Sequence, residues 1–244
     1  MHTVRFRDPT GLTRTGQLVD DVIETAGRTY SFGEATILPP CEPTKIICQA
    51  GGFLDHREES GVQKIPDRPE LFLKTPNCVI GHKDMIELPP NREQIEFEGE
   101  FGIVIDQQCR AVSTENAMGV VRGFTCLNDI SNRDDQEKER NWVRGKAFDA
   151  SLPTGPVLAT PNEVPDDARL ALRVNGETKQ QTTREQMYFS VPELVSEVSE
   201  LITLEPGDII ASGTPFGPGP LSDGDTVEVE FEGVGTLRNS VVSY

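Results

Sequence analysis

The chain has 244 residues, of which 23 are Lys or Arg and 40 are Asp or Glu, so its formal net charge is −17. Nucleic acids and anionic membrane surfaces bind proteins through excess positive charge, so this composition argues against both as partners. The sequence holds no run of about 18 apolar residues, and its start lacks the apolar segment of a secretory signal. We therefore expect a globular cytoplasmic protein without a membrane span.

The acid excess also predicts a protein adapted to high salt, where screening weakens the repulsion between surface carboxylates. An ordinary acidic cytoplasmic protein is the alternative.

The five cysteines are odd in number and widely spaced, and they form no C-x-x-C pair. This pattern indicates buried thiols rather than a disulfide framework or a zinc site.

The first half of the chain is predicted to consist mainly of strands. Residues 1–40 combine short alternating stretches with a stop at Leu38-Pro39-Pro40, which predicts a small N-terminal β appendage before a larger unit at 41–244. Residues 45–48 are typical of a buried strand. Residues 94–106 alternate between apolar and acidic side chains, which predicts one strand with an apolar face and an acidic face.

The second half adds two helices to further strands. Residues 114–121 have helical spacing with Ser113 or Thr114 as a cap, and residues 192–201 have it with Ser190 as a cap. Strands are expected at 123–130, 208–211 and 226–231, and the Asn175-Gly176 pair predicts a hairpin. The fold class predicted from these elements is β-rich α+β.

Three carboxylates are candidate metal ligands. Glu98 and Glu100 lie two residues apart on the predicted acidic strand face. Their side chains leave the backbone about 7 Å apart, so the two carboxylates could hold one cation. Asp129 ends a hydrophobic strand, where an ionised carboxylate needs a partner. Oxygen ligands favour Mg²⁺ or Mn²⁺. A solvated acidic strand without a metal is the alternative, and spacing alone favours it.

Other residues offer acid–base or electrostatic chemistry. On a helical turn His56 and Glu59 would be neighbours, so the carboxylate could orient the imidazole as a base for activating water. An exposed histidine on a charged loop is the alternative. Lys74 and Lys146 lie in apolar contexts and could hold a substrate carboxylate or serve as salt-bridge partners. Thr214 lies in a Gly-rich loop that could approach a ligand closely.

Taken together and in their order, these segments resemble the fumarylacetoacetate hydrolase family from about Lys45 to Asn239. The motifs that carry the resemblance are Asp55-His56-x-x-Glu59, Leu71-Phe72-Leu73-Lys74, Phe97-Glu98-Gly99-Glu100, Asn128-Asp129-Ile130-Ser131-Asn132-Arg133-Asp134, Arg144-Gly145-Lys146-Ala147-Phe148-Asp149, Ser190-Val191-Pro192-Glu193-Leu194, and Leu204-Glu205-Pro206-Gly207-Asp208 running to Gly213-Thr214-Pro215.

The resemblance implies a mixed β-roll catalytic domain at 41–244 that forms a homodimer. It implies Mg²⁺ or Mn²⁺ bound by Glu98, Glu100 and Asp129. It further implies that Lys146 and Thr214 contact a 2-oxo acid substrate, with Arg133 and Gln136 near it. His56 and Glu59 would form a catalytic dyad on a lid.

The activity implied first is metal-dependent hydrolysis of a C–C bond in a small 2-oxo acid such as an acylpyruvate, with decarboxylation of oxaloacetate next. The alternative is hydratase, dehydratase or isomerase action on a 2-oxo-enoic or 2-oxo-3-deoxy sugar acid in catabolism. Where many relatives carry Gly-x-Asn-Tyr, this chain has Ala50-Gly51-Gly52-Phe53. That departure motivates a third hypothesis, an inactive protein that keeps the metal for stability.

Overall fold

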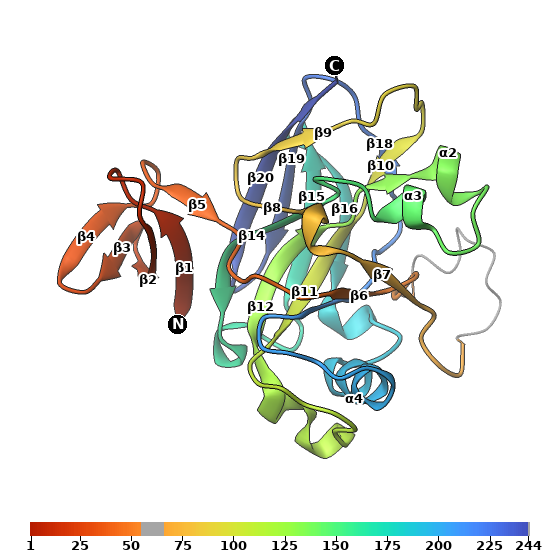
Figure 1. The fold of residues 1–244 in the computed structure, drawn as a ribbon, viewed down its shortest axis with the longest axis horizontal. Coiled ribbons are helices and arrows are strands. Elements are labelled where there is room, and N and C mark those ends of the chain that lie inside the picture. The colour runs from red at the N-terminus through yellow and green to blue at the C-terminus, as the bar shows by residue number, and fades with distance from the viewer. Residues whose placement is uncertain (55–65, 244) are drawn as a thin grey trace.

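The computed structural model describes residues 1–54 and 66–243. Strands dominate the fold, and both parallel and antiparallel pairs occur (Figure 1), so the predicted β-rich α+β class is confirmed. Twelve of the described strands form the largest sheet, and smaller sheets have five and three strands.

The strands are β1 (His2–Arg7), β2 (Thr13–Val19), β3 (Val22–Thr25), β4 (Arg28–Ser31), β5 (Thr36–Leu38), β6 (Ile46–Gln49), β7 (Leu71–Lys74), β8 (Val79–Ile80), β9 (Met85–Glu87), β10 (Ile95–Phe97), β11 (Gly99–Ile105), β12 (Val121–Asn128), β13 (Ser131–Asn132), β14 (Leu152–Ala159), β15 (Arg169–Val174), β16 (Glu177–Thr183), β17 (Ile209–Ala211), β18 (Gly219–Pro220), β19 (Thr226–Phe231) and β20 (Gly235–Val242). The α-helices are α2 (Arg133–Gln136), α3 (Val143–Lys146) and α4 (Val191–Leu201), and the 3₁₀-helices are η1 (Pro76–Cys78), η2 (Thr114–Val120), η3 (Pro161–Glu163) and η4 (Arg184–Gln186). None of these helices is long and apolar enough to cross a membrane.

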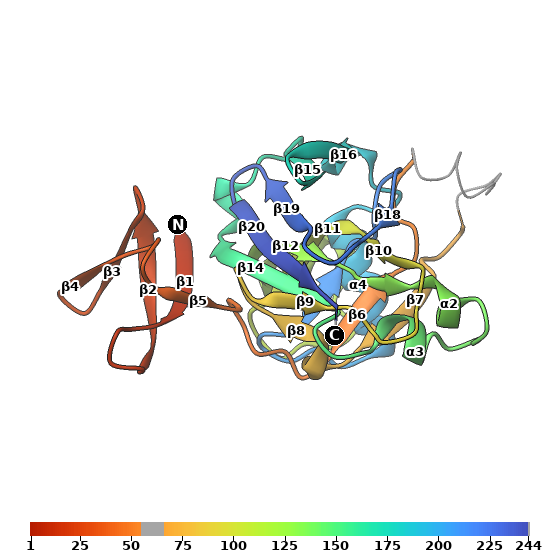
Figure 2. The same cartoon turned by 90° about the horizontal axis from the view of Figure 1, so that it is seen from above.

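Strands β1–β5 lie as a lobe at one side of the molecule, and α2 and α3 lie at the opposite side (Figures 1 and 2). The last strand of the lobe, β5, ends at Leu38, directly before the two prolines. The lobe joins the main sheet where β1 pairs with β14 at His2↔Ala159 and Thr3↔Leu158. The predicted N-terminal strands are therefore present, and a domain boundary at residue 40 stays a prediction.

The predicted acidic strand at 94–106 is interrupted at Glu98, where β10 ends and β11 begins. Strand β11 lies between β12 and β17 in the largest sheet, and all seven of its residues are buried. Side chains alternate between the two faces of a strand, so Phe101 and Glu100 lie on opposite faces of the sheet. The alternating pattern predicts extended chain here, but it does not predict that both faces of β11 are buried.

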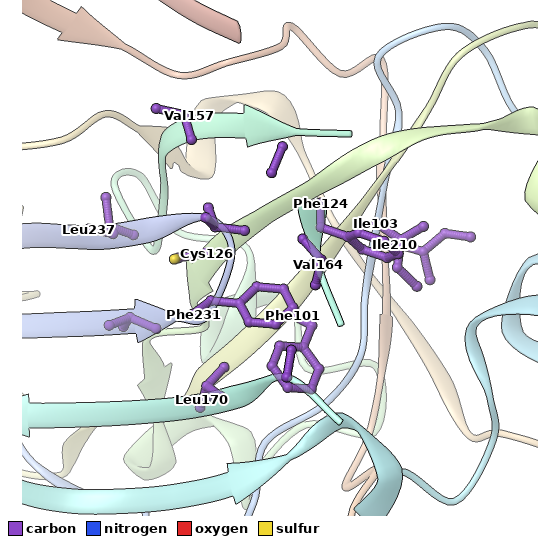
Figure 3. Close-up of a cluster of buried hydrophobic side chains, with 14 of the residues drawn as sticks. Phe101, Ile103, Phe124, Cys126, Val157, Val164, Leu170, Ile210, Phe231 and Leu237 are labelled. Atoms are coloured by element: carbon purple, nitrogen blue, oxygen red, sulfur yellow. The ribbon is translucent and has the colours of Figure 1, made fainter. Parts of the chain in front are cut away.

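Aromatic side chains pack the five-stranded sheet against the face of β11 that carries Phe101 (Figure 3). The Phe101 ring of β11 lies 4.3 Å from the Phe231 ring of β19, measured between centroids, and Phe231 also contacts Phe124 of β12 at 6.4 Å. Close packing of this kind leaves little room for water. The opposite face of β11 is the one on which Glu100 lies.

Most of the other predicted elements are present. Helix α4 begins after Ser190, whose side chain accepts from the Glu193 N–H in a capping box. The hairpin turn has positive φ at both Asn175 (53°) and Gly176 (81°), as a type I′ turn requires. All five cysteines are free, and all except the half-buried Cys109 are buried.

The predicted helix at 114–121 is instead the 3₁₀-helix η2, and Ser113 makes no capping hydrogen bond with its side chain. The segment is only seven residues long, contains Gly119 and passes directly into β12 at Val121. Short segments that contain glycine and lead into a strand suit a 3₁₀-helix better than an α-helix.

Candidate active site

Three carboxylates from separate elements meet on one face of the central sheet. Glu98 lies at the break between β10 and β11, Glu100 is the second residue of β11, and Asp129 follows the last residue of β12. Their oxygen atoms lie within 4.8 Å of one another, and all three residues are buried. The Asp129 N–H donates to the Glu98 carbonyl at 2.8 Å, so a backbone hydrogen bond holds Asp129 beside Glu98. The alternative of a solvated acidic strand face is wrong for these residues.

Lys146 places a positive charge between two of the three carboxylates. Its Nζ lies 2.8 Å from Glu98 Oε2, 2.8 Å from Asp129 Oδ2 and 2.6 Å from Ser131 Oγ. Burial alone lowers the pKa of a lysine, but the charges of Asp129 and Glu98 outweigh burial and raise the pKa of Lys146. The ammonium group therefore stays protonated at neutral pH and supplies positive charge rather than a base.

Lys74 is a second buried cation, on the other side of Asp129. Its Nζ lies 2.8 Å from Asp129 Oδ1. The same Nζ donates to the Ser151 carbonyl at 2.9 Å and to the Lys146 carbonyl, so it also fixes the backbone at Lys146. Despite the ion pair, Asp129 Oδ1 accepts no hydrogen bond of acceptable geometry from any residue in the described ranges.

Glu98 and Glu100 differ sharply in their partners. For Glu98, burial acts to raise the pKa, but Lys146 and Arg133 lower it to about 2. Glu100 has no salt-bridge partner within the described part of the chain, and its Oε2 accepts from the Gly213 N–H at 2.9 Å. Burial, together with the charges of Asp129 and Glu98, raises the pKa of Glu100 well above its ordinary value. Glu100 is therefore the one member of the triad that has no cation in contact with it among the described residues.

These donors fit a hard divalent cation. The set consists of carboxylate oxygens alone, which Mg²⁺ and Mn²⁺ prefer over nitrogen or sulfur. Asp129 Oδ1 accepts no hydrogen bond from the described residues, and the Glu100 carboxyl has the Gly213 N–H but no cation of the described chain beside it. Glu98, Glu100 and Asp129 could therefore hold such an ion together.

A cleft of about 620 Å³ opens beside the triad, and it contains the residues that the resemblance associates with substrate. Arg133 donates to Gln136 Oε1 at 2.6 Å and to Glu96 Oε2 at 2.7 Å, and it also forms an ion pair with Glu98. Thr214 lies in the same cleft. The residues that line it are Gln49, Ala50, Gly51, Phe72, Glu98, Arg133, Gln136, Glu137, Trp142, Lys146, Thr214 and Pro218.

The Thr214 loop approaches the segment in which the chain departs from the family pattern. Gly52 pairs with Thr214 in an isolated bridge and has φ of +120°, and a Cβ atom at Gly52 would lie 2.3 Å from the Ser212 carbonyl oxygen. Only glycine fits this backbone without a shift. Phe53 is fully buried, with its ring 5.7 Å from that of Phe101. Packing therefore accounts for Gly52 and Phe53.

Sequence reasoning did not single out the aromatic side chains of the cleft, Phe72 and Trp142. Their rings lie 5.4 Å apart in an edge-to-face arrangement, and Lys146 Nζ lies 5.1 Å from the Phe72 ring centroid. Trp142 has φ of +55°, a strained conformation for a bulky side chain. The available signal was that this single tryptophan stands just before the Arg144-Gly145-Lys146 motif. His56 and Glu59 lie outside the described residues.

Comparisons with known proteins identify the family to which the chain belongs. Residues 45–242 match the family model described as fumarylacetoacetate (FAA) hydrolase C-terminal. Oxaloacetate tautomerase YisK from Bacillus subtilis is 37% identical over 225 residues, which cover 87% of this chain and 75% of that protein.

Two solved structures share the fold over the whole chain. A 5-carboxymethyl-2-hydroxymuconate delta-isomerase from Mycobacterium smegmatis is 34% identical, with a TM-score of 0.93 and coverage of 100% of this chain and 99% of that one. A maleylpyruvate hydrolase from Sphingobium, solved with manganese(II) and pyruvate, is 26% identical, with a TM-score of 0.83 and the same coverage.

Proposed function

This chain belongs to the fumarylacetoacetate hydrolase family, and we propose that it is a divalent-metal-dependent enzyme that hydrolyses a C–C bond in a small 2-oxo acid such as an acylpyruvate. Decarboxylation of oxaloacetate is a second reaction open to the same site. The observation that carries the proposal is the buried triad of Glu98, Glu100 and Asp129, with Lys146 Nζ 2.8 Å from two of its members at the wall of a cleft.

Glu98, Glu100 and Asp129 would hold Mg²⁺ or Mn²⁺, which supplies a Lewis acid for the 2-oxo and carboxylate oxygens of the substrate. Lys146 adds a fixed positive charge beside them. When the C–C bond breaks, its electron pair moves toward the 2-oxo oxygen as an enolate forms. Positive charge held next to that oxygen in a buried site lowers the barrier.

Arg133, Gln136 and Thr214 orient the substrate in this proposal. Arg133 is held by Glu96, Glu98 and Gln136, so its position is set before a ligand arrives. Such preorganisation reduces the entropy lost on binding. The Phe72 and Trp142 rings form an apolar wall of the cleft that would limit the access of bulk water to the 2-oxo oxygen.

Hydrolysis also needs a base, and we assign that role to His56 oriented by Glu59. His56 takes a proton from water as the water oxygen attacks the distal carbonyl carbon. The C–C bond then breaks, and protonation of the enolate carbon yields a 2-oxo acid and a carboxylic acid. The sequence keeps His56, Glu59 and Lys146 together, which favours an active site over the inactive alternative.

Keto–enol tautomerisation or isomerisation of a 2-oxo acid is the second candidate. The Bacillus relative is named an oxaloacetate tautomerase and the Mycobacterium structure an isomerase. Both reactions pass through an enolate, so the same triad and Lys146 would serve them. They need proton transfer but no attacking water.

A spectrophotometric screen tests the proposal. An acylpyruvate, oxaloacetate and a 2-oxo-3-deoxy sugar acid are each incubated in high KCl with Mg²⁺, Mn²⁺ or EDTA. EDTA-sensitive release of pyruvate from the acylpyruvate supports the hydrolase. A change in the enol absorbance of oxaloacetate without release of pyruvate supports the tautomerase instead, and no metal-dependent turnover of any acid counts against both.

The variant Glu98→Gln separates an enzyme from a protein that uses metal for stability alone. An enzyme loses turnover and keeps its fold, whereas a structural site loses stability. Glu93→Gln is the matched control, because Glu93 is exposed and lies outside the triad.

Assembly as a homodimer is a further part of the proposal, and sedimentation equilibrium measures it directly.

A further inference from the structure

Gln180 is a buried amide that connects the acidic strand to the Thr214 loop. It lies on β16 in the five-stranded sheet and is 1% exposed. Its Oε1 accepts from the Gly99 N–H at 2.9 Å, and its Nε2 donates to Thr214 Oγ1 at 2.9 Å and to the Pro215 carbonyl at 3.0 Å. Gly99 stands between Glu98 and Glu100, so one side chain contacts both parts of the site.

The chemistry of these partners fixes the orientation of the amide. A backbone N–H can only donate, so the group that faces Gly99 must be the amide oxygen. A carbonyl can only accept, so the group that faces Pro215 and Thr214 must be the NH₂. The two ends of Gln180 therefore cannot exchange without loss of hydrogen bonds at both.

This orientation determines which way the Thr214 hydroxyl can donate. A hydroxyl has one proton, and Thr214 Oγ1 already accepts from Gln180, so its proton must point elsewhere. It points to the Gly99 carbonyl at 3.2 Å, which is longer than the usual O–H···O distance of about 2.7–2.8 Å. A closer anionic oxygen in the cleft, which Thr214 lines, would attract that proton.

We infer that Gln180 is a positioning residue that holds the Thr214 hydroxyl as a donor toward a substrate carboxylate. The inference rests on the proposed function and adds the residue that makes the Thr214 hydroxyl a donor in this contact. Without the Gln180 NH₂, the hydroxyl could rotate among several acceptors, and the anion would lose a prearranged donor.

Oxalate binding to the Mn²⁺-loaded protein, measured by calorimetry, tests the inference without any turnover. Gln180→Met removes the amide at similar volume, and we expect it to weaken oxalate binding about tenfold, while Mn²⁺ affinity stays within about twofold. Gln181→Met is the matched control, because Gln181 is the exposed neighbour on the same strand, and it should bind as the wild type does.

A double-mutant cycle separates positioning of Thr214 from general support of the fold. In a Thr214→Val background, Gln180→Met should cause no further loss of oxalate binding. Thr214→Ser keeps the hydroxyl, so this variant should bind oxalate nearly as the wild type does. Adding Gln180→Met to Thr214→Ser should again weaken oxalate binding about tenfold. If Gln180→Met does not fold, Gln180→Asn, which is too short to reach both partners, takes its place.

Unchanged oxalate binding in the Gln180 variant would overturn the inference, and so would an equal loss in the Thr214→Val background. A parallel fall in Mn²⁺ affinity would also overturn it, because Gln180 would then act through Glu98 and Glu100. If the wild type binds oxalate but turns over none of the acids, the proposed function alone fails. If it binds no oxalate, both fail.

Discussion

Asp208 and Glu100 are buried to the same degree, at 0% and 1% exposure, but of the two only Asp208 has a cationic partner among the described residues. Asp208 precedes β17 and accepts from the N–H and hydroxyl groups of Thr44 at 2.9 and 2.8 Å, from the Glu205 N–H at 2.8 Å, and from the Lys45 side chain. Glu100 lies on the adjacent strand β11 and accepts from the Gly213 N–H, with two other carboxylates beside it.

The difference distinguishes a carboxylate that the chain itself stabilises from one that could serve as a metal ligand. Burial acts to raise the pKa of Asp208, but Lys45, the Glu205 N–H and Thr44 lower it, so the net shift is downward. For Glu100, burial and the neighbouring charges act in the same direction, and the pKa rises. A buried charge that the chain leaves unbalanced costs stability unless something from outside binds it.

The largest effect is expected from Glu100→Gln. Loss of one ligand should weaken Mn²⁺ binding more than about 100-fold and lower turnover about 1,000-fold. The metal-free protein should become more stable at neutral pH, because the substitution removes a buried carboxyl group that is costly to ionise beside Asp129 and Glu98. Calorimetric Mn²⁺ titration and thermal melts in EDTA measure the two opposite changes.

The pH dependence of the metal-free protein gives a further check on Glu100→Gln. Because the folded pKa of Glu100 lies above its ordinary value of 4.5, the stability linked to its proton is present below about pH 4.5 and is lost as the pH rises through the folded pKa. The wild type in EDTA should therefore lose stability relative to Glu100→Gln above pH 5. A constant difference between the two proteins from pH 5 to 8 would contradict this account.

Asp208→Asn should have a smaller effect, and it should destabilise the protein rather than stabilise it. It removes the charge that Lys45 and the Thr44 and Glu205 donors stabilise, so we expect a loss of about 3 kcal/mol in the free energy of unfolding, with Mn²⁺ affinity unchanged. Urea denaturation measures the loss. Asp167→Asn is the control, since Asp167 is exposed, and equal destabilisation by both variants would show that Asp208 has no special role.

The smallest effect is expected from salt. The net charge of −17 implies repulsion among exposed carboxylates, and the screening length falls from about 10 Å at 0.1 M to about 3 Å at 1 M salt. Molar KCl should raise the Tm by a few degrees. The difference in Tm between Glu100→Gln and the wild type should not change, because salt screens buried charges poorly. A Tm that does not respond to KCl would remove the case for adaptation to high salt.

Local chemistry accounts for the parts of the fold that were predictable. The Asn175-Gly176 turn and the Ser190 cap depend on residues close in sequence, and they predict the hairpin and α4 correctly. The alternation at 94–106 predicts extended chain correctly but not the break at Glu98 that divides it into β10 and β11. The order of the motifs likewise identified the family. The helix predicted at 114–121 was wrong in type, because its continuation into β12 left only a short 3₁₀ segment.

What the sequence by itself determined was which residues could carry the chemistry, since carboxylates, a lysine and a threonine hydroxyl have the same capacities in any fold. Only the tertiary structure decided that Glu98 and Glu100 are buried, that Asp129 meets them, and that Gln180, 81 residues from Gly99, fixes the Thr214 hydroxyl. The physical reason is that the charge balance of a buried group depends on strands paired across long stretches of chain, and a local pattern contains no information about those partners.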